Sequence, residues 1–237
     1  MKLLKECTLT DKCSYLQNKE QTAHYKILSE CSSAYCMTLT QRGWRRFGKM
    51  FFRPICEGCS ECQSVKIDAQ NYNFSKSERR IIRKNSHIKT VLQHPTVTQK
   101  HIDLFNKYHR YMHQKKGWDN NQTDAKNYYT SFVSGHDSFG HEVLYYDQDK
   151  LIGVDLIDIL DNGISSIYFY YDPEYKNLSL GKYSLYRQIA FAKIYDKKWI
   201  YLGYYVKECE SLSYKSQFKP YLTLQGRPLE EQEDIWD

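Results

Sequence analysis

Several features that mark whole classes of protein are missing from this sequence. No apolar run reaches the length of about 18 residues that a membrane span requires. Residues 1–6 lack the apolar core of a signal peptide. Internal repeats and low-complexity tracts are also absent, which argues against a solenoid or a fibrous protein. The sequence therefore predicts a cytoplasmic chain with no membrane partner.

Proline and glycine are also scarce, with 5 and 11 residues among 237. A hydrophobic content of 41% and a charged content of 26% exclude a largely disordered chain. The length predicts one large or two small domains. The net charge of +6 permits contact with nucleic acid without requiring it. The 22 tyrosines suit clefts that need both apolar area and hydroxyl groups.

Without a signal peptide, the eight cysteines are better interpreted as thiols or ligands than as disulfides. Cys56, Cys59 and Cys62 follow C-x-x-C-x-x-C spacing around Gly58. Such spacing lets a tight turn direct several sulfurs toward one point. Two interpretations stay open, namely reduced structural thiols or part of a metal site.

Arginines and aromatic residues alternate just before these cysteines. Guanidinium planes and rings on one surface suit phosphates, carboxylates or stacked bases. The sequence therefore predicts an anion-binding surface here, built from Arg42, Arg45, Arg46 and Arg53 among Trp44, Phe47, Phe51 and Phe52.

In the first half we expect irregular structure over residues 1–40, giving way to a short helix at 33–42. Strands are expected at 51–54 and 64–68. A helix over 75–89 opens with Ser75 and Glu78, the pattern of a capping box. Its cations meet few acids, which favours a polyanionic partner, and they include Arg79, Arg80, Arg83 and Lys84.

In the second half, periodicity predicts an amphipathic helix over 98–116, whose histidines we expect at the surface, and a short helix over 127–134. Strands are expected at 142–147, 150–159 and 164–171, with Asp161-Asn162-Gly163 forming a hairpin turn. A helix over 178–193 and a strand over 198–204 follow. The acidic tail, 230–237, is expected to fray.

Two sets of motifs resemble one family. Q-R-G-W-R-R-F-G at 41–48 and F-R-P-I-C-E-G-C-S-E-C at 52–62 resemble the signature of the bacterial aminoacyl-tRNA–protein transferases, and the aspartate/glutamate leucyltransferases are the closest branch. Y-F-Y-Y-D-P at 168–173, Y-L-G-Y-Y-V at 201–206 and S-Y-K-S-Q-F-K-P at 213–220 resemble the C-terminal domain of that family. The likeness spans roughly residues 12–220.

This resemblance implies an α+β fold. A Cys-rich N-terminal region, 1–72, would precede a GNAT-like acyltransferase domain, 73–237, whose mixed, largely antiparallel sheet is flanked by helices. In that fold a strand splays from its neighbour, and a helix N-terminus beneath it binds the donor.

The resemblance also implies transfer of leucine from Leu-tRNA to the N-terminal amine of proteins that begin with Asp or Glu, which marks them for degradation in the N-degron pathway. The ester already carries the driving force, so the transfer requires no cofactor. Three alternatives stay open: an arginyl-tRNA–protein transferase, a zinc-ribbon-like RNA-binding protein without catalysis, and an acetyl-CoA-dependent enzyme.

Site residues follow from this expectation. The catalytic candidates are Asp155, Tyr168 and Tyr205. The substrate-binding candidates are Arg45, Arg46, Tyr170, Ser179, Tyr204 and Lys215, of which Lys215, Arg45 or Arg46 would hold the acidic side chain of the acceptor. The tRNA-binding candidates are Arg79, Arg80, Arg83, Lys84 and Lys182. Cys13 would join Cys56, Cys59 and Cys62 in a site for structural zinc or an iron–sulfur cluster.

Overall fold

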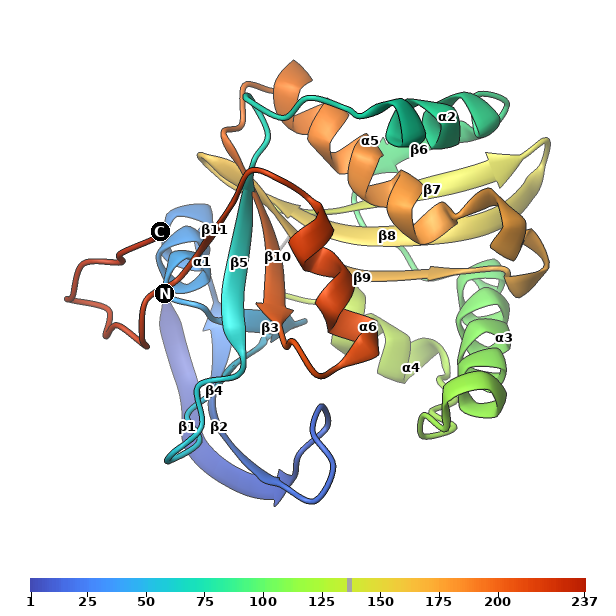
Figure 1. Ribbon diagram of the computed structural model, residues 1–237. Helices are drawn as coiled ribbons and strands as arrows, with labels where there is room; N and C mark the ends of the chain where they lie inside the picture. The colour runs from blue at the N-terminus through green and yellow to red at the C-terminus, as the bar shows by residue number, and fades with distance from the viewer. Residues whose placement is uncertain (136–137) are drawn as a thin grey trace.

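The computed structural model describes residues 1–135 and 138–237. The chain forms two sheets, a four-stranded one in the order β1-β2-β4-β3 and a seven-stranded one in the order β11-β5-β10-β9-β8-β7-β6. Helices α2 and α5 lie on one face of the larger sheet, and α3 and α4 lie on the other (Figure 1). The α+β class with a mixed, largely antiparallel sheet is therefore confirmed.

The small sheet contains β1 (Lys2–Lys12), β2 (Glu20–Glu30), β3 (Arg45–Phe47) and β4 (Met50–Pro54). The prediction of irregular structure over residues 1–40 is wrong, because β1 and β2 form a long antiparallel hairpin. Side chains of β1 are exposed along almost the whole strand, so the alternation of apolar and polar residues that reveals a strand is missing. The short helix α1 (Ser33–Gln41) appears as predicted, with Ser32 as its N-cap.

The large sheet takes strands from both halves of the chain. It contains β5 (Gln63–Asp68), β6 (Lys89–Gln93), β7 (Gly140–Asp147), β8 (Lys150–Ile159), β9 (Gly163–Tyr171), β10 (Trp199–Tyr205) and β11 (Tyr221–Thr223). β10 pairs in parallel with β9, and the other neighbouring strands pair antiparallel. The domain boundary at residue 72 stays a prediction, and β5, which precedes it, is hydrogen-bonded to β10 and β11.

Helix α2 (Lys76–Lys84) begins with the expected capping box. The backbone N–H of Ser75 donates to Glu78 Oε2 at 2.7 Å, and that of Glu78 donates to Ser75 Oγ at 3.3 Å. The helix ends before residue 89, because Asn85 turns the chain toward β6 and its amide donates to Ile81 O and Leu178 O, both at 2.9 Å. The bond to Leu178 O attaches the end of α2 to the segment before α5 (Leu180–Ile194).

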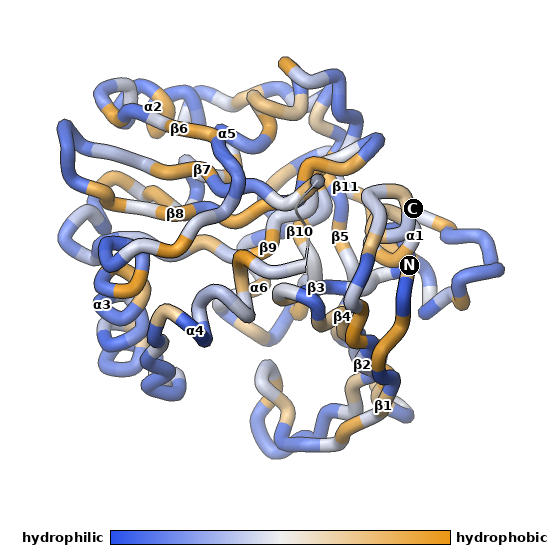
Figure 2. Tube along the Cα trace, turned by 180° about the vertical axis from the view of Figure 1, so that it is seen from behind, coloured by the Kyte–Doolittle hydropathy of each residue, from blue (hydrophilic) through white to orange (hydrophobic). Residues whose placement is uncertain are grey.

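The opposite face is covered by α3 (Gln99–Lys116), α4 (Ala125–Tyr128) and a π-helical turn, Tyr129–Val133. The expected surface position of the α3 histidines is wrong for His101 and His109, which are 2% and 7% exposed. Apolar residues follow the strands of the large sheet, and hydrophilic residues are frequent on α3 (Figure 2). None of the helices in the described parts of the chain is long and apolar enough to cross a membrane.

The C-terminal tail is bound rather than frayed. Asp237 O accepts from the backbone N–H of Thr223 at 2.6 Å, and Trp236 covers Lys66, whose Nζ lies 4.2 Å from the ring centroid. Acidic composition alone suggested fraying, but Glu230 accepts from the hydroxyl of Tyr35 at 2.7 Å and forms an ion pair with Lys26. The tail thus links β2 and α1 to β5 and β11.

Candidate active site

The two parallel strands of the large sheet separate partway along their length. β9 and β10 pair from Gly163 opposite Trp199 to Ser165 opposite Tyr201, and beyond this point the pairing stops. β10 bends at Gly203, whose φ of +74° favours glycine. β9 continues to Tyr171. This divergence is the splayed strand that the resemblance implied.

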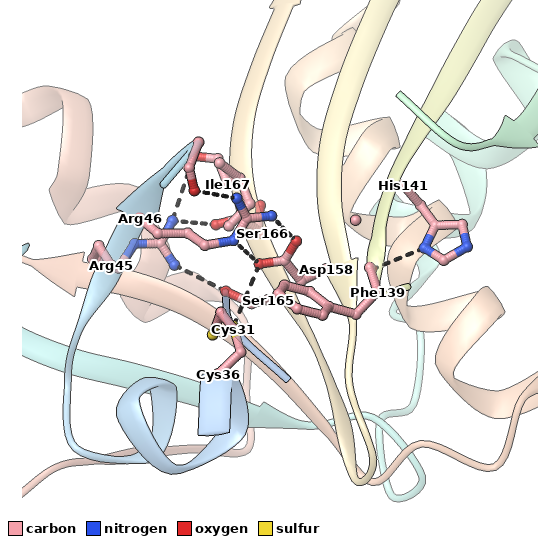
Figure 3. A network of polar contacts seen from close by, with 12 residues as sticks. Cys31, Cys36, Arg45, Arg46, Phe139, His141, Asp158, Ser165, Ser166 and Ile167 are labelled. Carbon is pink, nitrogen blue, oxygen red and sulfur yellow. Dashed lines mark hydrogen bonds and ion pairs between the residues drawn. The ribbon is translucent and has the colours of Figure 1, made fainter. Parts of the chain in front are cut away.

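Arg45 fills the opening between the strands. Its guanidinium donates to the backbone carbonyl of Ser166, and also to Ser165 Oγ and Ile167 O, both at 3.4 Å (Figure 3). A Cβ atom on Gly203 would lie 2.6 Å from Arg45 Nε, so glycine is what makes room for the guanidinium. Arg45 therefore satisfies carbonyl groups that the departing strand leaves without a partner.

A second cation lies beside Arg45. Lys215, in the 3-10 turn Tyr214–Gln217, is 8% exposed and donates from Nζ to Tyr204 O at 2.6 Å. Burial, and then the positive charge of Arg45, lower the pKa of Lys215 to about 7. Across residues 1–135 and 138–237, neither Lys215 nor Arg45 forms an ion pair with a carboxylate.

Arg46, the neighbour of Arg45, is in a different situation. It is buried and forms a two-point ion pair with Asp158 on β8, in which Nε lies 2.7 Å from Oδ2 (Figure 3). Arg46 was predicted to bind the substrate, but the charge of its guanidinium is already neutralised by Asp158. Tyr204 is similarly engaged, because its hydroxyl donates to Gly43 O at 3.0 Å, and this favours a structural role.

A cleft of about 1170 Å³ opens next to the two cations. Its walls are the loop between β1 and β2, the C-terminal end of α3 with Trp118, and the segment that leads into α6 (Glu210–Ser213). Tyr15 lines the cleft and lies near Arg45, and Cys209 lines it and lies near Lys215. Neither cation is itself part of the cleft lining, and each lies behind a residue that is.

The predicted catalytic residues Asp155 and Tyr168 lie on opposite faces of the sheet. Asp155 faces α5, where Gln188 Nε2 donates to Oδ2 at 2.9 Å, and burial raises the pKa of Asp155 to about 7. Tyr168 faces α3, where its hydroxyl lies 2.9 Å from His109 Nε2. Burial lowers the pKa of His109, so its imidazole is neutral near pH 7. The two candidates cannot reach one reacting atom from the same face.

Tyr168 belongs to an aromatic wall. Phe132 stacks on it with ring centroids 5.8 Å apart, and Phe47 and Phe105 pack around it at 6.3 and 6.1 Å. Tyr170, on the same face, is fully buried, and its hydroxyl bonds that of Tyr128 at 2.6 Å. Tyr170 therefore lies behind the wall, in the core. The third catalytic candidate, Tyr205, is half-buried at the end of β10.

The predicted tRNA-binding residues come together on one exposed surface. Lys84 Nζ donates to Asn177 O at 2.6 Å, which fixes α2 beside the start of α5, where Ser179 and Lys182 are exposed. Ser179 has left-handed backbone geometry and gives no side-chain cap to α5. We call this surface the α2/α5 basic surface, and it comprises Arg79, Arg80, Arg83, Lys84 and Lys182.

The four cysteines proposed as ligands are neighbours, because Cys13, Cys56 and Cys59 all influence the pKa of Cys62. Burial and these thiols raise the pKa of Cys62 to about 12. Within the described residues, no group of three or more His, Cys, Asp or Glu side chains is arranged to hold a metal ion. The arrangement therefore does not fit a formed site, and zinc or an iron–sulfur cluster stays a prediction that metal analysis of anaerobically purified protein would test.

Sequence reasoning missed Asp158, Gly203, His109 and Tyr15. The hairpin motif around 161–163 carried Asp158, but nothing local distinguishes it from the other aspartates of that strand. Gly203 interrupts the aromatic run of β10, and a glycine inside a strand is a signal of close backbone approach that could have found it.

Comparison with known proteins supports the family that the sequence motifs indicated. Residues 11–80 match the family model for the N terminus of arginine-tRNA-protein transferase, and residues 100–225 match the model for its C terminus. The chain is 48% identical to an aspartate/glutamate leucyltransferase of Campylobacter jejuni over 98% of this chain and 97% of that one. It is 38% identical to that of Helicobacter hepaticus over 95% and 93%.

A crystal structure of FemX aligns with a TM-score of 0.44 at 10% identity, over 71% of this chain and 59% of that one. This distant likeness adds nothing to the assignment, which rests on the relatives that match nearly the whole chain and on the two family models. The chain belongs to the aminoacyl-tRNA–protein transferase family, in the branch of the aspartate/glutamate leucyltransferases.

Proposed function

We propose that this aminoacyltransferase moves leucine from Leu-tRNA to the N-terminal α-amine of proteins that begin with Asp or Glu. The observation that carries the proposal is the pair of buried cations, Arg45 and Lys215, which lie behind residues of the cleft wall and have no carboxylate partner in the described parts of the chain. The name of the relatives supports both the amino acid transferred and the acceptors.

The charge balance of this pocket favours an acidic ligand. Arg45 lies close enough to Arg46 and to Lys215 for their charges to interact, and the ion pair that Asp158 forms is with Arg46. Burying a cation without a counter-ion is costly, so a carboxylate that enters the pocket gains two charge-assisted partners. An acceptor with Asp or Glu at its first position supplies that carboxylate next to its reacting amine.

The aromatic wall favours leucine over arginine as the transferred residue. Phe47, Phe105 and Phe132 surround Tyr168 with uncharged rings. An apolar side chain gains free energy by leaving water for such a wall, whereas a guanidinium would lose solvation there. We infer that the leucyl group lies along this wall, at the open end of the splay.

The chemistry requires positioning more than activation. The neutral amine attacks the ester carbonyl, the new C–N bond forms, the C–O bond to the terminal ribose breaks, and the departing ribose oxygen takes the proton that the amine loses. An α-amine has a pKa of about 7.7–8.0, so a useful fraction is neutral near pH 7. Holding the acceptor carboxylate at Arg45 and Lys215 orients the amine for this attack. Tyr168 and Tyr205 stay as proposed catalytic residues, whereas Asp155, which faces α5, cannot act on the same reacting atom as Tyr168.

The donor is proposed to contact the α2/α5 basic surface. Its four α2 cations are exposed and meet a single acid on the helix, Glu78, which is already used in the capping box. Such a surface fits the phosphate backbone of tRNA. We also propose that the protein works in the cytoplasm, where charged tRNA and new N-termini meet.

Radiolabelled Leu-tRNA and Arg-tRNA, offered with peptides that begin with Asp, Glu, Asn or Ala, test the reaction. Leucine should appear on the Asp and Glu peptides only. Lys215→Met should reduce this transfer and narrow the preference for Asp over Asn, because the lost cation recognises the carboxylate. The matched control is Lys100→Met at an exposed site on α3, which should behave as the wild type.

Other outcomes would change the assignment. Arginine on the same peptides would keep the acceptor pocket and replace the donor. tRNA binding without transfer would support the RNA-binding alternative, although relatives named as transferases match the chain across both halves. Substituting Arg79, Arg80 and Arg83 with Gln should raise the KM for Leu-tRNA and leave kcat and the KM for the acceptor peptide unchanged. This tests the α2/α5 basic surface separately.

A further inference from the structure

A pair of thiols lies beside the candidate active site and has no part in the proposed transfer. Cys31 directly precedes Ser32, the N-cap of α1, and Cys36 lies in the next turn of that helix. Side chains just before an N-cap and four positions into a helix commonly meet, and each of these thiols shifts the pKa of the other through a hydrogen bond. Cys31 is half-buried, whereas Cys36 is 1% exposed, so reagents in solution can reach only the first thiol directly.

The surroundings make the two thiols chemically unequal. The hydrogen bond from Cys36, and then the nearby charge of Arg46, lower the pKa of Cys31, which enriches its thiolate. The hydrogen bond to Cys31 and burial raise the pKa of Cys36. An accessible thiolate next to a protected thiol is the arrangement found in reversible thiol oxidation, in which one sulfur reacts and the other resolves the product.

The pair also touches the ion pair behind Arg45. Cys36 Sγ lies 4.0 Å from Asp158 Oδ2, and Asp158 holds Arg46 (Figure 3). The carboxylate therefore lies where it can stabilise the proton that leaves Cys36. From these contacts we propose that Cys31 and Cys36 form a reversible dithiol site, oxidised by hydroperoxides and restored by thiol reductants.

The proposed step balances as follows. The Cys31 thiolate attacks one oxygen of the hydroperoxide, the O–O bond breaks, and Cys31 becomes a sulfenic acid while an alcohol or water leaves. Cys36 sulfur then attacks Cys31 sulfur, an S–S bond forms, the S–O bond breaks, and the hydroxide takes the Cys36 proton and leaves as water. Two thiols are oxidised by two electrons, and the hydroperoxide is reduced.

Peptide mapping can test the site without any assay of transfer. Trypsin cuts after Lys26 and Arg42, and no Lys or Arg lies between them, so both cysteines fall in one peptide, residues 27–42. Reduced, intact protein is exposed to hydrogen peroxide, then alkylated and digested. We expect this peptide to lose two hydrogens and take up no alkylating agent, and to take up two after dithiothreitol.

Cys7 is the internal control, because it is half-buried like Cys31 and lies opposite Tyr25 in the β1–β2 hairpin. Its peptide should remain alkylated at the same peroxide dose. In Cys36→Ser, Cys31 should stop at a sulfenic acid that dimedone traps. Two alkylated thiols in peptide 27–42 at doses that oxidise Cys7, or a disulfide that joins Cys31 to another peptide, would overturn the proposal.

Discussion

Replacing Lys215 with Met should make the protein more stable although it weakens acceptor binding. Lys215 is buried, and its pKa falls from 10.5 in the unfolded chain to about 7 in the folded one. Below pH 7 both states carry the charge, and the folded state bears the full cost of burying it. Between pH 7 and 10.5 the folded state releases the proton that the unfolded state keeps, so the cost declines, and above 10.5 it is gone.

The size of the effect follows from that shift. At about 1.36 kcal/mol for each pH unit, the charge of Lys215 costs about 5 kcal/mol at pH 6 and about 2 kcal/mol at pH 9. Losing the bond from Nζ to Tyr204 O returns about 1–3 kcal/mol. Lys215→Met should therefore raise the free energy of unfolding by about 2–4 kcal/mol at pH 6, and this gain should shrink by about 3 kcal/mol at pH 9.

Urea unfolding at pH 6 and pH 9 measures both quantities. Lys100→Met provides the matched control, because Lys100 is exposed and its substitution should change stability little at either pH. A variant at Lys215 that is less stable than the wild type at pH 6, or whose stability difference is the same at both pH values, would refute the buried charge. The unpaired lysine would then have to be explained without an acceptor carboxylate.

Three further predictions address the surrounding residues. Arg46→Met should lower the free energy of unfolding by about 3–5 kcal/mol because it leaves Asp158 buried and charged, whereas adding Asp158→Leu should restore most of it; urea unfolding of the wild type and these two variants decides this. Gly203→Ala should reduce transfer to an Asp peptide, since its Cβ meets the guanidinium that fills the splay, whereas Gly58→Ala has equally positive φ but open space and should retain activity. The kcat/KM for an Asp peptide, corrected for titration of the peptide amine, should fall above about pH 7 as Lys215 loses its proton, by up to about tenfold at pH 8. Lys215→Arg should remove this fall, and a fall that persists in that variant would assign the titration to another group.

Local features of the chain were predictable from sequence because short-range physics fixes them. The capping box at Ser75, the end of α3 at Gly117 and the hairpin at 161–163 each depend on residues a few positions apart. Likewise, the motifs at 41–48 and 52–62 were enough to indicate the family, and the cations Arg45 and Lys215 were already candidates for an acidic ligand.

The roles of individual residues depended on partners far away in the chain. Arg45 and Arg46 are adjacent and chemically identical, yet only Arg46 meets Asp158, 112 residues away. Asp155 and Tyr168 looked like one site, and the pleat of β8 and β9 placed them on opposite faces. The tail seemed free because its binding depends on Lys26, Tyr35 and Lys66.

By itself the sequence indicated the family and, through that resemblance, the fold class and the cations proposed to hold an acidic side chain, since short motifs carry the resemblance. Only the tertiary structure decided which arginine pairs with a carboxylate, where the strands part and which carboxylate lies beside Cys36. The physical reason is that charge neutralisation and burial are properties of neighbours in space, and folding brings together residues that no local pattern connects.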